Sequence, residues 1–288
     1  MSTLQTLEVP GYQVIRYLGS GARSTIWHVR DCRTDESFAI KRVVRRQNGD
    51  EKFLEQAVNE HKIGSQLDHE GIRHIYQIRR LKKWLTLREI HLMMEFCEGQ
   101  TVQETRPSDV QEVLRIFGCV AEALAYMNAK GFVHADMKPN NILVAPDGKV
   151  KIIDLGQSCP LGTVKERIQG TPDFIAPEQV YRRPLDSRTD VFNFGAALYW
   201  TLTGKAITTV LPKKENVTML SDLSVRPPDQ LNPMVPPALS KVVIDCVEVH
   251  PTNRPSTMGE VAKRLGMISA TLKRAPQPPD ILEAPPED

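Results

Sequence analysis

Apolar and polar residues alternate along three stretches near the start of the chain, at residues 12–18, 24–30 and 37–43. Two further alternating stretches, 73–81 and 85–95, complete the first third of the sequence. A period of two residues is typical of β-strands that bury one face, and the small or polar residues between the stretches are typical of turns. This part of the chain therefore predicts a mostly antiparallel sheet.

Helical spacing of apolar residues replaces the alternation in four places. They are residues 51–67, 110–129, 192–202 and 258–272. The run 192–202 is the most apolar of them, but Asn193 and Gly195 interrupt it, and it is too short to cross a membrane. We expect an α+β fold with two lobes: a small, mostly antiparallel β lobe containing one helix, and a larger, mainly helical lobe.

Length and composition add limits to this picture. A chain of 288 residues is long for a single core, in agreement with two unequal lobes. Its 37 Lys and Arg against 35 Asp and Glu give no support to nucleic-acid binding. Five cysteines without a C-x-x-C pair predict reduced thiols, and no leader or spanning segment is evident, so we expect a cytoplasmic protein without a membrane span.

Four polar side chains that suit phosphoryl transfer lie in the stretch 134–156. They are Asp136, Lys138, Asn141 and Asp154, and a loop, a short strand, a tight turn and a second strand carry them. The reaction requires a carboxylate to orient the attacking hydroxyl, a cation near the moving charge and oxygen ligands for Mg²⁺. Any one of them alone fits the polar rim of a hairpin equally well. All four in this order favour a site that holds a metal phosphate.

This stretch resembles the catalytic loop and the metal-binding loop of eukaryotic-type Ser/Thr protein kinases, whose motifs are H-R-D-L-x-x-x-N and D-F-G. Residues 134–136 read His-Ala-Asp here, and residues 154–156 read Asp-Leu-Gly. The resemblance implies Asp136 as the catalytic base, ATP as a substrate and Mg²⁺, or alternatively Mn²⁺, as the metal. The chain resembles the non-RD type, because Ala135 stands where the motif has arginine.

Two motifs of the small lobe imply how the nucleotide binds. The small residues between the first two strands resemble the glycine-rich phosphate lid, with Ser24 in place of the third glycine. Residues 38–41 resemble V-A-I-K, which implies that Lys41 contacts the α and β phosphates. Glu60 is its implied partner, and Glu55 is the alternative. The residues implied at the nucleotide are Gly19, Ser20, Gly21, Ser24, Ile26, Ala39, Lys41, Met94, Glu95, Cys97 and Leu143.

Residues 93–99 resemble the hinge between the lobes of such kinases. The resemblance implies that a purine pairs with main-chain groups near Glu95 and Cys97, with Met94 at the back of the pocket. Gly99 supports a linker. We therefore expect an N-terminal extension, a nucleotide-binding lobe, a catalytic lobe and a disordered Pro-rich acidic tail. Their bounds are 1–11, 12–98, 99–272 and 273–288.

The loop-rich segment 154–178 ends in Ala-Pro-Glu and resembles the activation segment of these kinases. Thr171 matches the threonine that bridges the catalytic aspartate and lysine in Ser/Thr kinases. Asp190 matches a buried aspartate that anchors the catalytic loop. Glu178 and Arg254 match a buried ion pair, and burying either charge alone would cost several kcal/mol.

Two departures from the family pattern concern regulation. Ala135 has no charge to offer a phosphate, so phosphorylation of Ser158 or Thr163 is not expected to switch the enzyme on, although Arg167 could substitute. Gly64 lies one helical turn after Glu60. A glycine inside a helix costs about 1 kcal/mol against alanine, and we interpret Gly64 as a sign of a mobile helix. Either the segment is ordered by its own packing, or control acts on that helix.

The interpretation that fits these motifs is an active kinase that phosphorylates Ser and Thr hydroxyls of proteins with Mg-ATP. A pseudokinase that binds nucleotide or partners is one alternative, and a small-molecule kinase is another. Retention of all the catalytic motif residues counts against a pseudokinase, and the Ala-Pro-Glu segment with its threonine counts against a small-molecule kinase. A basic cluster at residues 79–83, between two predicted strands, is expected to be a solvated hairpin end.

Overall fold

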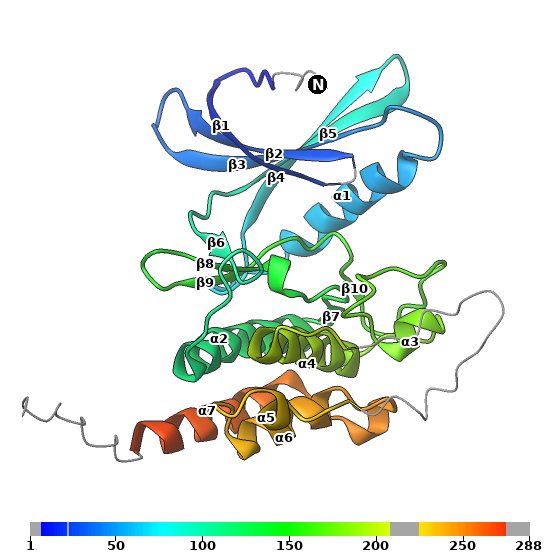
Figure 1. The fold of residues 1–288 in the computed structure, drawn as a ribbon. Coiled ribbons are helices and arrows are strands. Elements are labelled where there is room, and N and C mark those ends of the chain that lie inside the picture. Colours follow the sequence, from blue (N-terminus) through cyan, green and yellow to red (C-terminus); the bar gives the residue numbers. More distant parts are fainter. Residues whose placement is uncertain (1–6, 22, 208–224, 275–288) are drawn as a thin grey trace, which may run out of the picture.

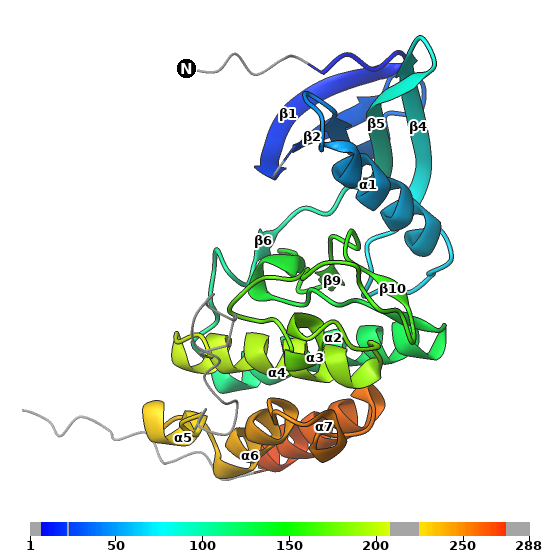
Figure 2. The same cartoon turned by 90° about the vertical axis from the view of Figure 1, so that its right-hand side faces the viewer.

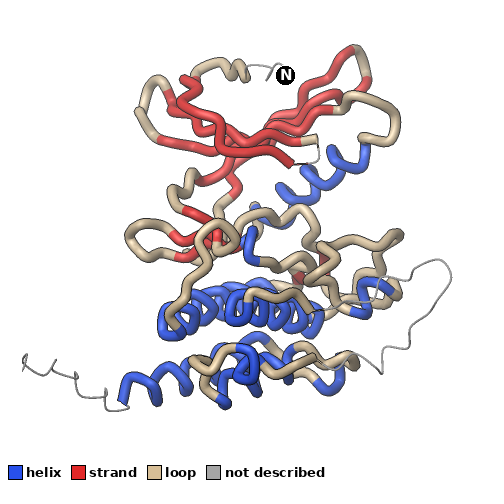
Figure 3. The backbone as a smooth tube through the Cα atoms, in the orientation of Figure 1, coloured by secondary structure: helices blue, strands red, loops and turns tan. Residues whose placement is uncertain are grey.

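The computed structural model describes residues 7–21, 23–207 and 225–274. Strands gather at one end of the molecule and helices at the other, with loops and short strands between them (Figure 3). The two-lobed α+β prediction is therefore confirmed. The predicted tail lies outside the described residues except for its first two, which belong to a helix.

The small lobe is built on a five-stranded antiparallel sheet in the order β1-β2-β3-β5-β4 (Figure 1). Its strands are β1 (Tyr12–Gly21), β2 (Ser24–Asp31), β3 (Ser37–Val44), β4 (Ile75–Lys83) and β5 (Thr86–Glu95). Alternation places one set of side chains against helix α1 (Glu51–Gly64), which contacts β3, β4 and β5. The opposite face holds a second cluster that includes Trp27 and Ile40 and is covered by Leu7 and Val9. Residues 7–9 of the expected extension thus pack on the sheet.

The large lobe consists of two layers of helices (Figure 2). The layer nearer the sheet contains α2 (Val110–Ala129) and α4 (Ser187–Thr203), and the outer layer contains α5 (Pro228–Leu231), α6 (Pro237–Cys246) and α7 (Met258–Arg274). Asp109 caps α2 by accepting a hydrogen bond from the Glu112 amide, and Gly204 ends α4 in the left-handed region. The most apolar predicted helix lies in α4, where nearly every residue is buried.

Short elements fill the space between the lobes. They are β6 (Gln100–Thr101), β7 (Phe132–Val133), the 3-10 turn η1 (Pro139–Asn141), β8 (Ile142–Val144), β9 (Val150–Ile152), β10 (Cys159–Pro160) and α3 (Pro177–Val180), while the 3-10 turn η3 (Pro251–Asn253) precedes α7. Strand β8 pairs with β6 and β9, and β7 pairs with β10. The β8–β9 hairpin is the one that the sequence predicted, and the candidate residues flank it: Asn141 directly precedes β8, and Asp154 follows β9 after one intervening residue.

Helix α1 ends at Gly64, three residues before the predicted end. Gly64 is buried, and an added Cβ would lie 2.8 Å from Cγ1 of Ile75. Close packing of Ile75 is therefore a physical reason for the glycine that does not require a mobile helix. No helix in the described part of the chain is long and apolar enough to cross a membrane.

Candidate active site

Asp190, in α4, holds the backbone of the catalytic loop in place. Its carboxylate accepts hydrogen bonds from the amides of His134 (3.0 Å) and Ala135 (2.9 Å) and from the Asn128 side chain (2.8 Å). Asp190 is fully buried, and three donors compensate the lost hydration of its carboxylate. Ala135 has a φ of 60°, a left-handed conformation that turns the backbone directly before Asp136.

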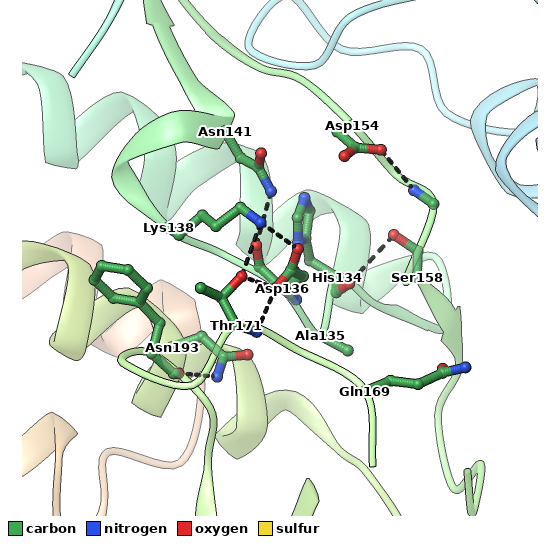
Figure 4. Close-up of polar contacts among 12 residues, drawn as sticks. His134, Ala135, Asp136, Lys138, Asn141, Asp154, Ser158, Gln169, Thr171 and Asn193 are labelled. Carbon is green, nitrogen blue, oxygen red and sulfur yellow. Dashed lines mark hydrogen bonds and ion pairs between the residues drawn. The ribbon is translucent and has the colours of Figure 1, made fainter. Parts of the chain in front are cut away.

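Asp136, Lys138 and Thr171 form a compact polar cluster (Figure 4). The Lys138 ammonium lies 2.9 Å from one oxygen of the Asp136 carboxylate, and it donates a 2.8 Å hydrogen bond to the Thr171 hydroxyl. The other Asp136 oxygen accepts hydrogen bonds from both the amide and the hydroxyl of Thr171, each at 3.0 Å. The threonine therefore ties the activation segment to the carboxylate and fixes its orientation.

Asn141 and Asp154 present oxygen atoms beside this cluster. The Asn141 amide nitrogen donates to the carbonyl oxygen of Asp136 at 2.8 Å, which leaves its own carbonyl oxygen available as a ligand. Among the described residues, the hydrogen bonds of Asp154 all involve Oδ1, so Oδ2 is also available. Such hard oxygen donors fit Mg²⁺, which is usually held by one or two protein groups together with substrate phosphates.

Lys41, on β3, lies between two carboxylates. Its ammonium is 2.7 Å from Glu60 on α1 and 3.0 Å from Asp154. Burial by itself would lower the pKa of Lys41, but the two carboxylates raise it above its ordinary value, while Lys41 lowers the pKa of Asp154. The lysine is therefore charged, and α1 is docked against the site. Glu55, the alternative partner, is exposed and makes no contact with Lys41.

The predicted phosphate lid is the end of the β1–β2 hairpin, where Gly21 pairs with Ser24. Arg23, which directly precedes Ser24, donates a 3.0 Å hydrogen bond to Asp50, the residue before α1. The contact ties the lid to the helix that carries the lysine's partner. No motif in the sequence indicates this contact between Arg23 and Asp50.

The other residues predicted at the nucleotide surround the place where the sheet meets the β8–β9 hairpin. Ala39 and Met94 are direct neighbours in the β3–β5 ladder and are buried, as is Leu143 on β8. The Cys97 amide donates to no backbone group of the described residues, whereas the Glu95 amide bonds His74. A main-chain donor is thus available at the expected hinge position.

Glu178 and Arg254 form a buried bidentate ion pair, with N to O distances of 2.7 and 3.0 Å. Arg254 also donates to the carbonyl oxygens of Arg188, Glu248 and Val249, so its guanidinium is nearly saturated. Removing either partner would leave an unpaired buried charge, which is costly, so the two residues stay paired. The pair therefore anchors the end of the activation segment.

Gln179, which the sequence reasoning missed, connects three segments. Its amide nitrogen donates to the carbonyl oxygens of Ala135 (2.7 Å) and Gln169 (3.2 Å), and its amide oxygen accepts from the Ala176 amide and the Asn193 side chain, both at 2.9 Å. Gln179 is buried, and Asn193 in turn donates to the Phe174 carbonyl. The only signal in the sequence was a polar residue directly after Ala-Pro-Glu.

The first part of the activation segment is held by backbone pairing and side-chain contacts. Strand β10 pairs with β7, directly before the catalytic loop. Ser158 is fully buried, its hydroxyl donates to the His134 carbonyl at 3.4 Å, and its own carbonyl accepts from Asn59 on α1 at 2.7 Å. These contacts join the start of the segment to the catalytic loop and to α1, and Figure 4 shows the one between Ser158 and His134.

Comparisons with known proteins agree with this geometry. Residues 12–265 match the family described as protein kinase domain. A probable serine/threonine-protein kinase of Clostridium acetobutylicum is 26% identical over 266 residues, which cover 89% of this chain and 40% of that protein. Serine/threonine-protein kinase PknA of Mycobacterium tuberculosis is 26% identical, covering 93% of this chain and 63% of that protein. Serine/threonine-protein kinase PknD of Chlamydia trachomatis is 25% identical, covering 88% and 31%. The chain therefore spans between about a third and two thirds of these relatives.

Proposed function

Because the chain belongs to the protein kinase domain family, we propose that it is an active Ser/Thr protein kinase that uses Mg-ATP. The observation that carries the proposal is a set of three contacts: the Lys41 ammonium pairs with both Glu60 and Asp154, and the Lys138 ammonium pairs with Asp136. A scaffold without catalysis would have little reason to keep the whole set, which is Lys41, Glu60, Asp136, Asn141 and Asp154.

Each residue has a role that its contacts support. Asp136 orients the acceptor hydroxyl and takes its proton as the hydroxyl oxygen bonds the γ-phosphorus and ADP departs. Lys138, held against Asp136, neutralises charge that develops on the transferred group. Lys41 holds the α and β phosphates, and Glu60 positions Lys41. The magnesium ion, which Asn141 and Asp154 would hold, supplies charge neutralisation on the phosphates.

The acceptor is a Ser or Thr of a protein in this proposal. Thr171 and Lys138 share a hydrogen bond next to Asp136, and the segment after Thr171 is anchored by Glu178 and Arg254. An anchored segment beside Asp136 is a surface on which an extended peptide could lie, whereas a small-molecule kinase has no need of one.

The free thiols of all five cysteines suit a reducing, ATP-containing compartment, so we place this domain in the cytoplasm. We keep Gly99 as the boundary between the lobes.

Incubation with labelled ATP, Mg²⁺ and an array of Ser-, Thr- and Tyr-containing peptides tests the proposal. We expect labelling of Ser or Thr peptides by the wild type and none by the Asp136→Asn variant. An Asp154→Asn variant should fold normally and also be inactive, because it loses a metal ligand and not a core group. Transfer by either variant near the wild-type rate would contradict the assignment, and nucleotide binding without any transfer by the wild type would favour a pseudokinase.

A further inference from the structure

The tip of the β4–β5 hairpin exposes two large apolar side chains. Strand pairing continues to Lys83 and Thr86, so the connecting loop is only Trp84 and Leu85. Trp84 is 92% exposed and Leu85 is 94% exposed, the two highest values among the exposed large hydrophobic residues. Adjacent apolar residues in full contact with water are an unfavourable arrangement unless something covers them.

The turn itself is unsuited to these residues. Two-residue hairpin loops favour Asn-Gly or similar pairs, because they require left-handed backbone conformations. Trp84 has a φ of 58°, a conformation that is an outlier for a bulky residue. Glycine or asparagine would form this turn more easily than tryptophan does. Turn geometry therefore does not explain Trp84, and its exposed indole is more readily explained by a contact with another surface.

Five exposed cations lie on the β4–β5 hairpin, and two of them, Lys82 and Lys83, directly precede Trp84. Arg79, Arg80, Lys82, Lys83 and Arg88 all lie on this hairpin, and none of them forms an ion pair with a described residue. The nearest acidic residue on the hairpin, Glu89, is already paired with Arg42 and His91. The distal hairpin is therefore strongly positive, and no ion pair with a described residue neutralises these five cations.

The hairpin points away from the helical lobe. Figures 1 and 2, which differ by a 90° rotation, both show the turn between β4 and β5 at the far end of the small lobe. Nothing else in the described part of the chain covers it. A flat or soft surface could therefore approach the tip without touching the candidate active site.

We propose that the β4–β5 tip, residues 82–86, docks the protein on a membrane surface rich in anionic phospholipid. Trp84 and Leu85 enter the boundary between headgroups and acyl chains, a position that indole rings favour, while the surrounding cations face the phosphates. A protein partner fits less well, because two protruding side chains fall far short of the roughly 800 Å² per partner of a standard interface. A bilayer, in contrast, deforms around a small wedge.

Co-sedimentation of the full chain with vesicles tests this proposal. We expect binding to phosphatidylcholine vesicles that contain phosphatidylglycerol, weak binding to phosphatidylcholine alone, and release at about 1 M salt, where the screening length is about 3 Å. Lys82→Gln with Lys83→Gln should weaken binding roughly 20-fold. Trp84→Ser with Leu85→Ser should weaken it at least about tenfold, since it removes the buried apolar area.

Two controls make these results specific. Lys263→Gln with Lys273→Gln removes the same charge from exposed positions of α7, at the opposite end of the molecule, and should leave binding unchanged. Both tip variants should keep the wild-type unfolding midpoint and soluble-peptide phosphorylation. Trp27 is buried and Trp200 is partly buried, so a blue shift of tryptophan emission on vesicle addition reports Trp84 and should vanish in Trp84→Phe.

The proposal is overturned if the wild type does not bind anionic vesicles, or if both tip variants bind as tightly as the wild type. Equal binding to neutral and anionic vesicles would also overturn it. Trp84-dependent binding to polyglutamate in the absence of vesicle binding would assign the tip to an acidic protein instead. None of these results depends on the proposed kinase activity.

Discussion

The side-chain amide of Gln179 donates a 2.7 Å hydrogen bond to the carbonyl oxygen of Ala135, the residue directly before Asp136. The same amide nitrogen reaches the Gln169 carbonyl, so one buried group joins the catalytic loop to the activation segment. In the family pattern the residue at position 135 is an arginine, and a phosphate on the activation segment pairs with it and orders the segment. Here residue 135 is alanine, and the neutral amide of Gln179 makes a connection between the two segments.

Gln179→Glu should lower peptide phosphorylation by about 10- to 100-fold. The carboxylate retains the two acceptor contacts but faces the carbonyl oxygens of Ala135 and Gln169 without a proton to donate, a loss of about 1–3 kcal/mol at a buried site. Steady-state kinetics measure the effect, and Gln169→Glu is the control, because that residue contributes only its backbone carbonyl to the contact. Unchanged activity in Gln179→Glu would remove Gln179 from this role.

Lys41→Met should lower phosphoryl transfer by orders of magnitude, and Glu60→Gln should lower it less. Lys41 is proposed to touch the nucleotide and also contacts Asp154, whereas Glu60 acts only by positioning Lys41. Initial rates at saturating ATP give the order of the two effects. Glu55→Gln is the matched control and should be neutral, since Glu55 is exposed. A larger loss at Glu60 than at Lys41 would mean that these roles are assigned wrongly.

The double variant Ser158→Ala with Thr163→Ala should phosphorylate peptides within a few-fold of the wild type. Ser158 is fully buried and Thr163 donates a 2.6 Å hydrogen bond to Pro160, so neither hydroxyl has to carry a phosphate for the segment to be ordered. The loss of two local hydrogen bonds should cost about 1–2 kcal/mol of stability at most. An inactive double variant that Thr163→Glu restores would show that the segment is a phosphorylation switch after all.

Glu89→Gln should destabilise the small lobe at pH 7 by about 1–3 kcal/mol, and the difference should shrink below pH 4.5. Burial opposes ionisation of Glu89, but hydrogen bonds from His91 and Arg42 outweigh it and lower the pKa of Glu89 to about 2. A carboxylate with a lowered pKa stabilises the fold above its unfolded value of 4.5, and this stabilisation is lost as the pH falls toward 2.

Urea unfolding at neutral and acidic pH measures this difference. The control is Glu122→Gln, because Glu122 is exposed on α2 and forms no ion pair with a described residue. If Glu89→Gln and the wild type differ by the same free energy at both pH values, ionisation of Glu89 is not the source of the stabilisation.

The sequence by itself determined the features that depend on neighbouring residues. Alternation of apolar residues gave the five strands of the sheet, and α2 runs from Val110 to Ala129 as predicted. The β8–β9 hairpin followed from its turn residues, so Asn141 and Asp154 were placed on one short unit. Strand and helix periods and turn preferences are local properties, which one stretch of sequence carries completely.

Only the tertiary structure decided which distant groups meet. Lys41 and Asp154 are 113 positions apart and touch because the sheet, α1 and the hairpin pack together. Gln179 reaches Ala135, and Arg23 reaches Asp50, through packing that no local pattern encodes. The reason for Gly64 could not be predicted either. The side chain that occupies the space where a Cβ of residue 64 would lie is Ile75, which belongs to strand β4 and not to the helix. Periodicity shows which face of an element is buried, but the partner on that face is fixed only when the whole chain has packed.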